Sequence, residues 1–189
     1  MKKILVFCAA FIVCTSAYAE NTKTLSFMGG LNINIISHTD TSNANPYSES
    51  SHFNFAKNGG IFFGVDYEET FQLLFSFSQS YSKLHPYYSD ATAKSYSYEP
   101  KISLYWLFGD YKVKPYIAAI MSMSFIDNET YDAVIPFYGA AFGGEYSITT
   151  NVFSKIGIEY MFAPSKDLPY MSDYKSKSFS LNLSLGYRF

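Results

Sequence analysis

The sequence is dominated by a period-two alternation of apolar with polar or small residues, which recurs in eight segments. The segments are residues 24–36, 59–67, 71–82, 101–108, 112–125, 137–148, 151–162 and 180–189. Because successive side chains of a strand point to opposite sides of a sheet, this pattern is typical of strands that have one apolar face. The sequence therefore predicts an all-β protein with eight strands.

The connections between these segments alternate between short and long. The second and third segments meet at Glu68–Glu69, the fourth and fifth at Gly109–Asp110, and the sixth and seventh at residues 149–151. All three are predicted to be tight hairpin turns. The other four connections are longer and polar, at about residues 37–52, 84–94, 126–134 and 163–174. Short turns at one end and long loops at the other are typical of a transmembrane β-barrel.

Alternation by itself does not say which face of a closed sheet is inside, so a soluble eight-stranded barrel of the lipocalin type is the alternative. Two features favour a membrane barrel. The polar face is rich in glycine and serine, as a narrow lumen requires, and aromatic residues, 20% of the chain, gather at segment ends, where a bilayer meets water. The segments are also close to the ~9–11 residues with which a tilted strand crosses a bilayer. The predicted fold class is all-β, an eight-stranded antiparallel transmembrane β-barrel.

The amino terminus has the pattern of a secretory signal peptide. Two lysines precede an apolar run from Ile4 to Cys14, and Ala17-Tyr18-Ala19 follows as a cleavage site. The run is shorter than the ~20 residues of a spanning helix. We therefore predict a cleaved signal peptide over residues 1–19 and one barrel domain over residues 20–189. Both cysteines lie within the predicted signal, so no disulfide is expected.

Charged residues on the predicted inward face suggest a plugged lumen, since eight strands leave only enough interior for side chains. The inward charged residues are Asp66, Lys101, Lys112, Lys114, Glu145, Lys155, Glu159 and Arg188. Continuing the alternation through the 149–151 turn places Glu145 opposite Lys155, with Arg188 in reach. Buried charges persist only when they are paired. The predicted lumen salt-bridge network is Asp66, Glu145, Lys155, Glu159 and Arg188; a path for protons or ions is the alternative.

The second half of the chain resembles a known family. The segments that carry the resemblance are Lys114–Phe125 (KPYIAAIMSMSF), Phe137–Phe162 (FYGAAFGGEYSITTNVFSKIGIEYMF) and the final LSLGYRF. The chain resembles the small bacterial outer-membrane β-barrel family that contains opacity-like surface antigens and the transmembrane domain of outer-membrane protein A. The resemblance implies a barrel fold and an outer-membrane location, and it implies little about activity.

The carboxyl-terminal segment ends on an aromatic residue within the alternation. In a barrel the last strand must pair with the first, because a membrane tolerates no open edge. The segment also resembles the signal by which the bacterial outer-membrane assembly machinery recognises its clients. The residues that match are Leu183, Leu185, Gly186, Tyr187 and Phe189. The assembly machinery is therefore an expected partner.

Charge and motif content argue against several classes of function. The net charge is −2 and no basic patch is present, so no nucleic-acid partner is expected. His38, Asp40 and Ser42 could be arranged as in a lipid A palmitoyltransferase, whereas a deacylase-like histidine on a late strand is missing, since none follows His85. No catalytic triad spacing, metal site or cofactor motif is recognisable, and the sequence predicts no enzyme.

Loops on a rigid barrel are where recognition tends to sit. Amphipathic tyrosines occur in three of the predicted loops and are candidate contacts: Tyr87, Tyr88, Tyr131, Tyr170 and Tyr174. The tyrosines at 87 and 88 could equally complete an outer aromatic girdle. We expect a monomeric surface protein, embedded among outer-membrane lipid and lipopolysaccharide, with a structural, adhesion or surface-antigen role and a host or cell-surface ligand. A lipid A-modifying enzyme and a narrow passive pore are the alternatives.

Overall fold

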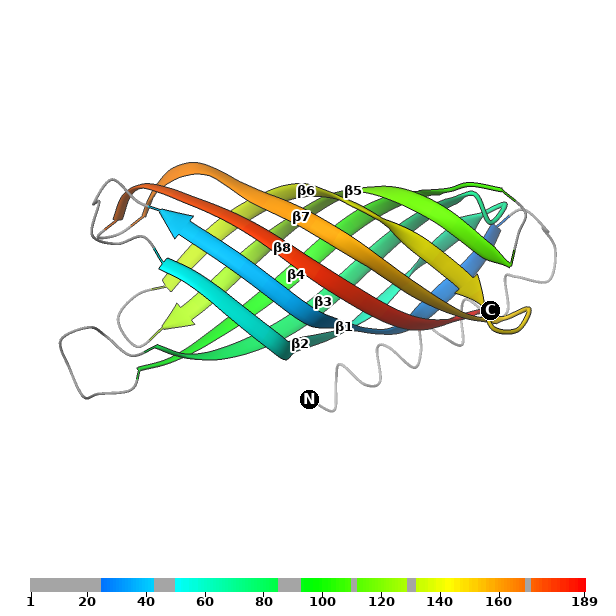
Figure 1. The fold of residues 1–189 in the computed structure, drawn as a ribbon, viewed down its shortest axis with the longest axis horizontal. Coiled ribbons are helices and arrows are strands. Elements are labelled where there is room, and N and C mark those ends of the chain that lie inside the picture. Colours follow the sequence, from blue (N-terminus) through cyan, green and yellow to red (C-terminus); the bar gives the residue numbers. More distant parts are fainter. Residues whose placement is uncertain (1–24, 43–49, 85–92, 110–111, 129–131, 169–170) are drawn as a thin grey trace.

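The computed structural model describes residues 25–42, 50–84, 93–109, 112–128, 132–168 and 171–189. They form eight strands, β1 (Leu25–Ser42), β2 (Ser50–Tyr67), β3 (Phe71–Leu84), β4 (Ala93–Leu107), β5 (Val113–Asn128), β6 (Asp132–Ser147), β7 (Val152–Leu168) and β8 (Met171–Arg188). Each strand pairs antiparallel with its neighbours in chain order, and β1 also pairs with β8, so the sheet closes into a barrel (Figure 1). The predicted eight-stranded antiparallel barrel is confirmed. No helix with the length and apolar character needed to cross a bilayer occurs among these residues.

The barrel wall is apolar on its outside and polar on its inside. Leu31, Phe142 and Ile156 point outward and are 63%, 60% and 52% exposed, whereas Gln72 and Glu145 point inward and are completely buried. A soluble barrel has the opposite arrangement, because its apolar side chains fill the interior. An outer surface of this kind is stable only against hydrocarbon. The soluble lipocalin-type alternative is therefore wrong, and the chain is a transmembrane barrel.

The three short turns lie at the same end of the barrel as the carboxyl terminus (Figure 1). The turn after β2 holds Glu68 and Glu69 with φ of 53° and 51°, the two left-handed residues of a tight hairpin connection. Thr70 closes this turn by donating its N–H to the Tyr67 carbonyl at 3.0 Å. Aromatic rings gather at this end, where Phe71 and Trp106 stack with their centroids 5.9 Å apart, as expected of an interfacial girdle.

The strands are longer than the sequence predicted, at 14–18 residues instead of about 9–11. The predicted loop over residues 37–52 is wrong over much of its length, because β1 continues to Ser42 and β2 begins at Ser50. The same holds for residues 84, 93–94, 126–128, 132–134, 163–168 and 171–174, which are strand. Polar residues on both faces erase the alternation without preventing backbone pairing, and register continues through Asp40↔Ser51.

At two places in the interior, aromatic rings pack against pairs of glycines. The Tyr116 side chain lies against Gly143 and Gly157, which pair across β6 and β7. The rings of Phe62 and Phe153, 6.2 Å apart, cover the Gly30–Gly186 pair, which belongs to the closing seam of β1 and β8. A Cβ atom at Gly143 would overlap the Ile156 carbonyl oxygen and would stand 2.7 Å from the Tyr116 hydroxyl. Glycine is therefore required at these positions so that the rings can approach the wall.

We predict that Gly143→Ala destabilises the barrel by about 1–3 kcal/mol, the usual range for overpacking a tight interior. Gly144→Ala is the matched control, because its new methyl group would meet only Val113 at an ordinary 3.6 Å. Urea unfolding of the refolded proteins in detergent, followed by heat-modifiable gel mobility, measures both. Equal urea midpoints for the two variants would show that the interior around Gly143 is not tightly packed.

Candidate functional site

A layer of polar side chains from five strands crosses the lumen near the turn end. They are Asp66 of β2, Gln72 of β3, Glu145 of β6, Lys155 of β7 and Arg188 of β8. All five are at most 5% exposed. Each points inward because it lies on the polar side of the alternation of its strand. Glu145 and Lys155 stand directly opposite each other in the β6–β7 register. We call these five residues the ionic layer.

The contacts within the ionic layer pair every charge. Arg188 donates from Nε to Asp66 Oδ2 at 2.8 Å and from Nη2 to Glu145. Gln72 donates from Nε2 to Asp66 at 3.0 Å and to Glu145 at 2.9 Å, and its Oε1 accepts from Lys155 Nζ. Lys155 Nζ also lies 3.6 Å from Glu145 Oε2. Two carboxylates and two cations balance, which is the condition under which buried charges are tolerated.

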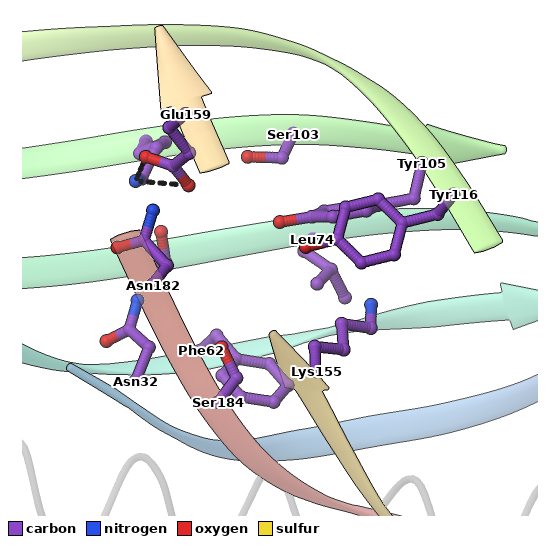
Figure 2. Close-up of a pocket in the computed structure, with 12 residues that line it drawn as sticks. Asn32, Phe62, Leu74, Ser103, Tyr105, Tyr116, Lys155, Glu159, Asn182 and Ser184 are labelled. Atoms are coloured by element: carbon purple, nitrogen blue, oxygen red, sulfur yellow. Dashed lines mark hydrogen bonds and ion pairs between the residues drawn. The ribbon is translucent and has the colours of Figure 1, made fainter. Parts of the chain in front are cut away.

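Aromatic rings cover the two cations. Lys155 Nζ lies 4.0 Å from the centroid of the Tyr105 ring, and Arg188 Cζ lies 4.6 Å from that of Phe153. Figure 2 shows the Lys155 side chain pointing toward the rings of Tyr105 and Tyr116. Cation–π attraction is strongest where water is excluded. The rings thus stabilise the two cations of the ionic layer.

The sequence reasoning grouped Glu159 with the ionic layer, and the structure places it elsewhere. Glu159 accepts two hydrogen bonds from Lys101 Nζ, at 2.8 and 3.2 Å, and forms a separate buried pair (Figure 2). It lies four residues beyond Lys155 on β7, two inward positions farther from the turn end. Gln72, the centre of the layer, is not among the predicted residues, because the predicted network contained charged residues only. Gln72 is an uncharged amide on the inward face of β3.

A small cavity lies between the ionic layer and the Lys101–Glu159 pair (Figure 2). Asn32, Asn182 and Ser184 line it from the β1–β8 side, and its volume is about 20 Å³, room for about one water molecule. Asn32 Oδ1 is buried there without a hydrogen-bond partner in the described part of the chain. In the described barrel, side chains thus fill the interior at this level except for this small space.

Two further lysines predicted to be inward behave differently from each other. Lys114 is buried and donates to the Glu69 carboxylate in the turn before β3. This hydrogen bond holds the pKa of the Glu69 carboxyl below its ordinary value. Lys112 was predicted to face the lumen, and that prediction is wrong. It precedes β5, is exposed, and places Nζ 5.0 Å from the centroid of the outward Tyr146 ring.

The residues predicted as an assembly signal lie in the closing seam. Leu183, Leu185 and Tyr187 point outward and are 38%, 52% and 45% exposed. Gly186 points inward beneath Phe153, and Phe189 donates its N–H to the Phe27 carbonyl of β1 at 2.8 Å. The segment thus has a structural role in joining β8 to β1. Its recognition by an assembly machinery stays a prediction.

Four of the predicted contact tyrosines, Tyr87, Tyr88, Tyr131 and Tyr170, lie outside the described residues. Tyr174 belongs to β8, where its backbone stands opposite Lys166, so its assignment to a loop is wrong. His38 is the histidine of the palmitoyltransferase-like alternative. It lies in β1, where its backbone stands opposite Phe53 and Phe179. Within the described ranges no group of His, Cys, Asp and Glu could hold a metal ion.

Comparison with known proteins identifies the fold. No family model and no curated sequence matches the chain. The crystal structure of Neisserial surface protein A (NspA) superposes with a TM-score of 0.58 at 16% identity, covering 86% of this chain and 98% of that one. OprG, an outer-membrane protein of Pseudomonas aeruginosa, gives 0.51 at 10% identity, with 87% and 95% covered. The chain therefore has the fold of small bacterial outer-membrane β-barrels, as the resemblance predicted.

We predict that Glu145→Gln lowers the free energy of unfolding by about 3–5 kcal/mol, because it leaves the layer with one uncompensated buried cation. Glu68→Gln is the control, since Glu68 is exposed in the neighbouring turn and surface changes of this kind usually stay within about 0.5 kcal/mol. Urea titration in detergent measures the difference. A Glu145→Gln midpoint equal to that of the control would mean that the layer is hydrated and carries little of the stability.

Proposed function

We propose that the protein is an integral bacterial outer-membrane protein, exported by a cleaved signal peptide, whose closed barrel anchors four surface hairpins that bind a host or cell-surface molecule. The observation that carries the proposal is the contrast between the two sides of the wall. The outside is apolar and the inside is filled by paired charges and aromatic rings. A barrel built in this way can anchor and display, and it leaves little room for transport.

The polar ends of the hairpins support the display role. On the outward face of β8 the apolar residues run from Tyr187 to Phe179, and the next two outward residues are the exposed Lys177 and Lys175. Charged side chains at this position mark the upper limit of the hydrocarbon, because lysine is costly on the lipid face of a barrel. The strands continue past this limit, so paired hairpins stand in water above the membrane.

A rigid, paired hairpin is a suitable support for recognition. Residues held by a ladder lose little conformational entropy on binding, in contrast to a flexible loop. The segment from Ser37 to Thr41 stays in register with both β2 and β8, which gives the first hairpin a neighbour on either side. Contacts to a macromolecular partner on this surface would therefore be preorganised. The proposed partner is a host, matrix or neighbouring cell-surface molecule.

We predict that replacing residues 38–51 and 85–92 with short turns leaves the barrel folded and abolishes adhesion of expressing bacteria to cultured host cells and immobilised matrix. The control replaces Thr149 and Thr150 at the opposite end with Asn-Gly, which should not change adhesion. Heat-modifiable gel mobility checks folding in both variants. Adhesion that persists at the wild-type level after both loop replacements would contradict the proposed binding role.

We also predict that the wild-type protein shows no steady conductance in planar bilayers, because the ionic layer and the Lys101–Glu159 pair both cross the lumen. Single-channel recording at 1 M salt measures this conductance. Because screening by salt is strong there, charges in the lumen would hardly prevent ions from crossing an open path. A large, steady conductance would identify a pore and would contradict the proposed closed lumen.

A further inference from the structure

A hollow of about 350 Å³ lies on the outer wall over β3, β4 and β5. Its lining is largely apolar and includes Phe75, Phe77, Pro100, Ile102, Met121 and Met123. The volume is within the ~300–1,000 Å³ range of small-molecule sites. We call this hollow the wall groove. It is separate from the cavity inside the lumen, although Ser76 and Lys101 take part in lining both.

The wall groove lies over an interruption in the sheet. Pairing between β4 and β5 includes Tyr98↔Phe125 and resumes at Lys101↔Ser122, so Glu99 and Pro100 have no partner on β5. On the other side of β4, Pro100 is still paired with Phe77. Proline has no N–H to give to a ladder, and it is normally excluded from central strands. The β4–β5 pairing is therefore looser beneath the groove than along the rest of its length.

The side chains beside this interruption do not close it. Ser122, at the point where pairing resumes, is buried and its hydroxyl has no hydrogen-bond partner in the described barrel. Stacked pairs stand along the groove, Phe63 with Phe75 at 5.6 Å and Phe77 with Tyr98 at 6.2 Å. Met121 and Met123 are 43% and 45% exposed. Methionine adapts its shape to a ligand more easily than branched residues do.

The position of the groove determines the chemistry of its occupant. Phe77, Ile102 and Met123 belong to the outward apolar belt, which faces hydrocarbon. A peptide strand could not be added there, because apart from residues 99 and 100 both neighbours of β4 are paired along this region. A second barrel presents a convex wall, which would leave a hollow unfilled. A single acyl chain fits an apolar groove that is open to the bilayer.

We propose that the wall groove binds one acyl chain of an outer-membrane lipid as a specific site, distinct from the general contact of lipid with the wall. The proposal rests on the proposed membrane location. Binding would cover the unpaired region at Pro100 and fill space that the protein itself leaves empty. The groove would then hold a lipid at a fixed place on β3–β5 beneath the surface hairpins.

Methyl NMR of the full-length barrel in alkyl-maltoside micelles tests the proposal, with methionine ε-methyl groups as reporters. The probe is a phosphatidylethanolamine with a nitroxide near the end of one acyl chain, added to the detergent in increasing mole fraction, so that no unlabelled phospholipid competes for the groove. We expect saturable broadening of Met121 and Met123. Met28 and Met161 are buried in the lumen, 2% and 5% exposed, and serve as internal controls. A Leu185→Met variant reports on the far wall, where broadening should grow linearly.

Ile102→Trp fills the groove, and Leu104→Trp places the same ring two residues away on the same outward face, outside the groove. We expect Ile102→Trp to raise the mole fraction for half-saturation about tenfold and Leu104→Trp to leave it unchanged. Linear broadening of equal size at the groove and at the Leu185→Met reporter would overturn the proposed lipid site and leave the membrane location standing. No broadening at any outward reporter would overturn the membrane location and, with it, the site.

Discussion

Closure of the sheet between β1 and β8 is the constraint on which the rest of the structure depends. A strand edge cannot be left open in hydrocarbon, because each unpaired backbone group there costs several kcal/mol. The seam extends from Met28↔Arg188 to Ser42↔Lys175 and is one of the longest pairings in the barrel. The Phe27 carbonyl receives the N–H of Phe189, so the final residue is part of the closure. Gly30 and Gly186 pair within the seam and admit the rings of Phe62 and Phe153.

Closure with eight strands creates a narrow interior, and the interior is where the polar residues must go. Because the outer face is apolar, every charged residue of the spanning region points inward and has to find a partner. Gln72 solves part of this problem, since its amide donates to both Asp66 and Glu145 while its carbonyl accepts from Lys155. The charged groups act as a cross-link between strands that are not neighbours, because Asp66 on β2 and Glu145 on β6 are both held by Arg188 on β8.

The wall and the hairpins differ in how strictly their sequences are constrained. Within the apolar belt a one-residue slip would turn a strand inside out, so alternation is maintained. Beyond Phe179 the outward residues of β8 are the exposed Lys177 and Lys175, whereas the inward Ser176 is buried. Polar residues thus occupy both faces and the sequence no longer alternates, while the pairing with β1 continues through Lys177↔Asp40. The only interruption described between β4 and β5 within the belt coincides with Pro100.

The sequence by itself determined the number of strands, their order, the three short turns and the opposition of Glu145 to Lys155, because each follows from a period of two carried through a turn. It indicated from composition that the apolar face is outside, and the exposure of the apolar side chains on the closed barrel decided the matter. Only the tertiary structure separated Glu159 from the ionic layer and brought in Gln72, since these contacts cross the lumen between distant strands. Only the tertiary structure extended the hairpins to Ser42 and Ser50. Backbone pairing needs no alternation, and a pattern of side chains therefore cannot show where a strand in water ends.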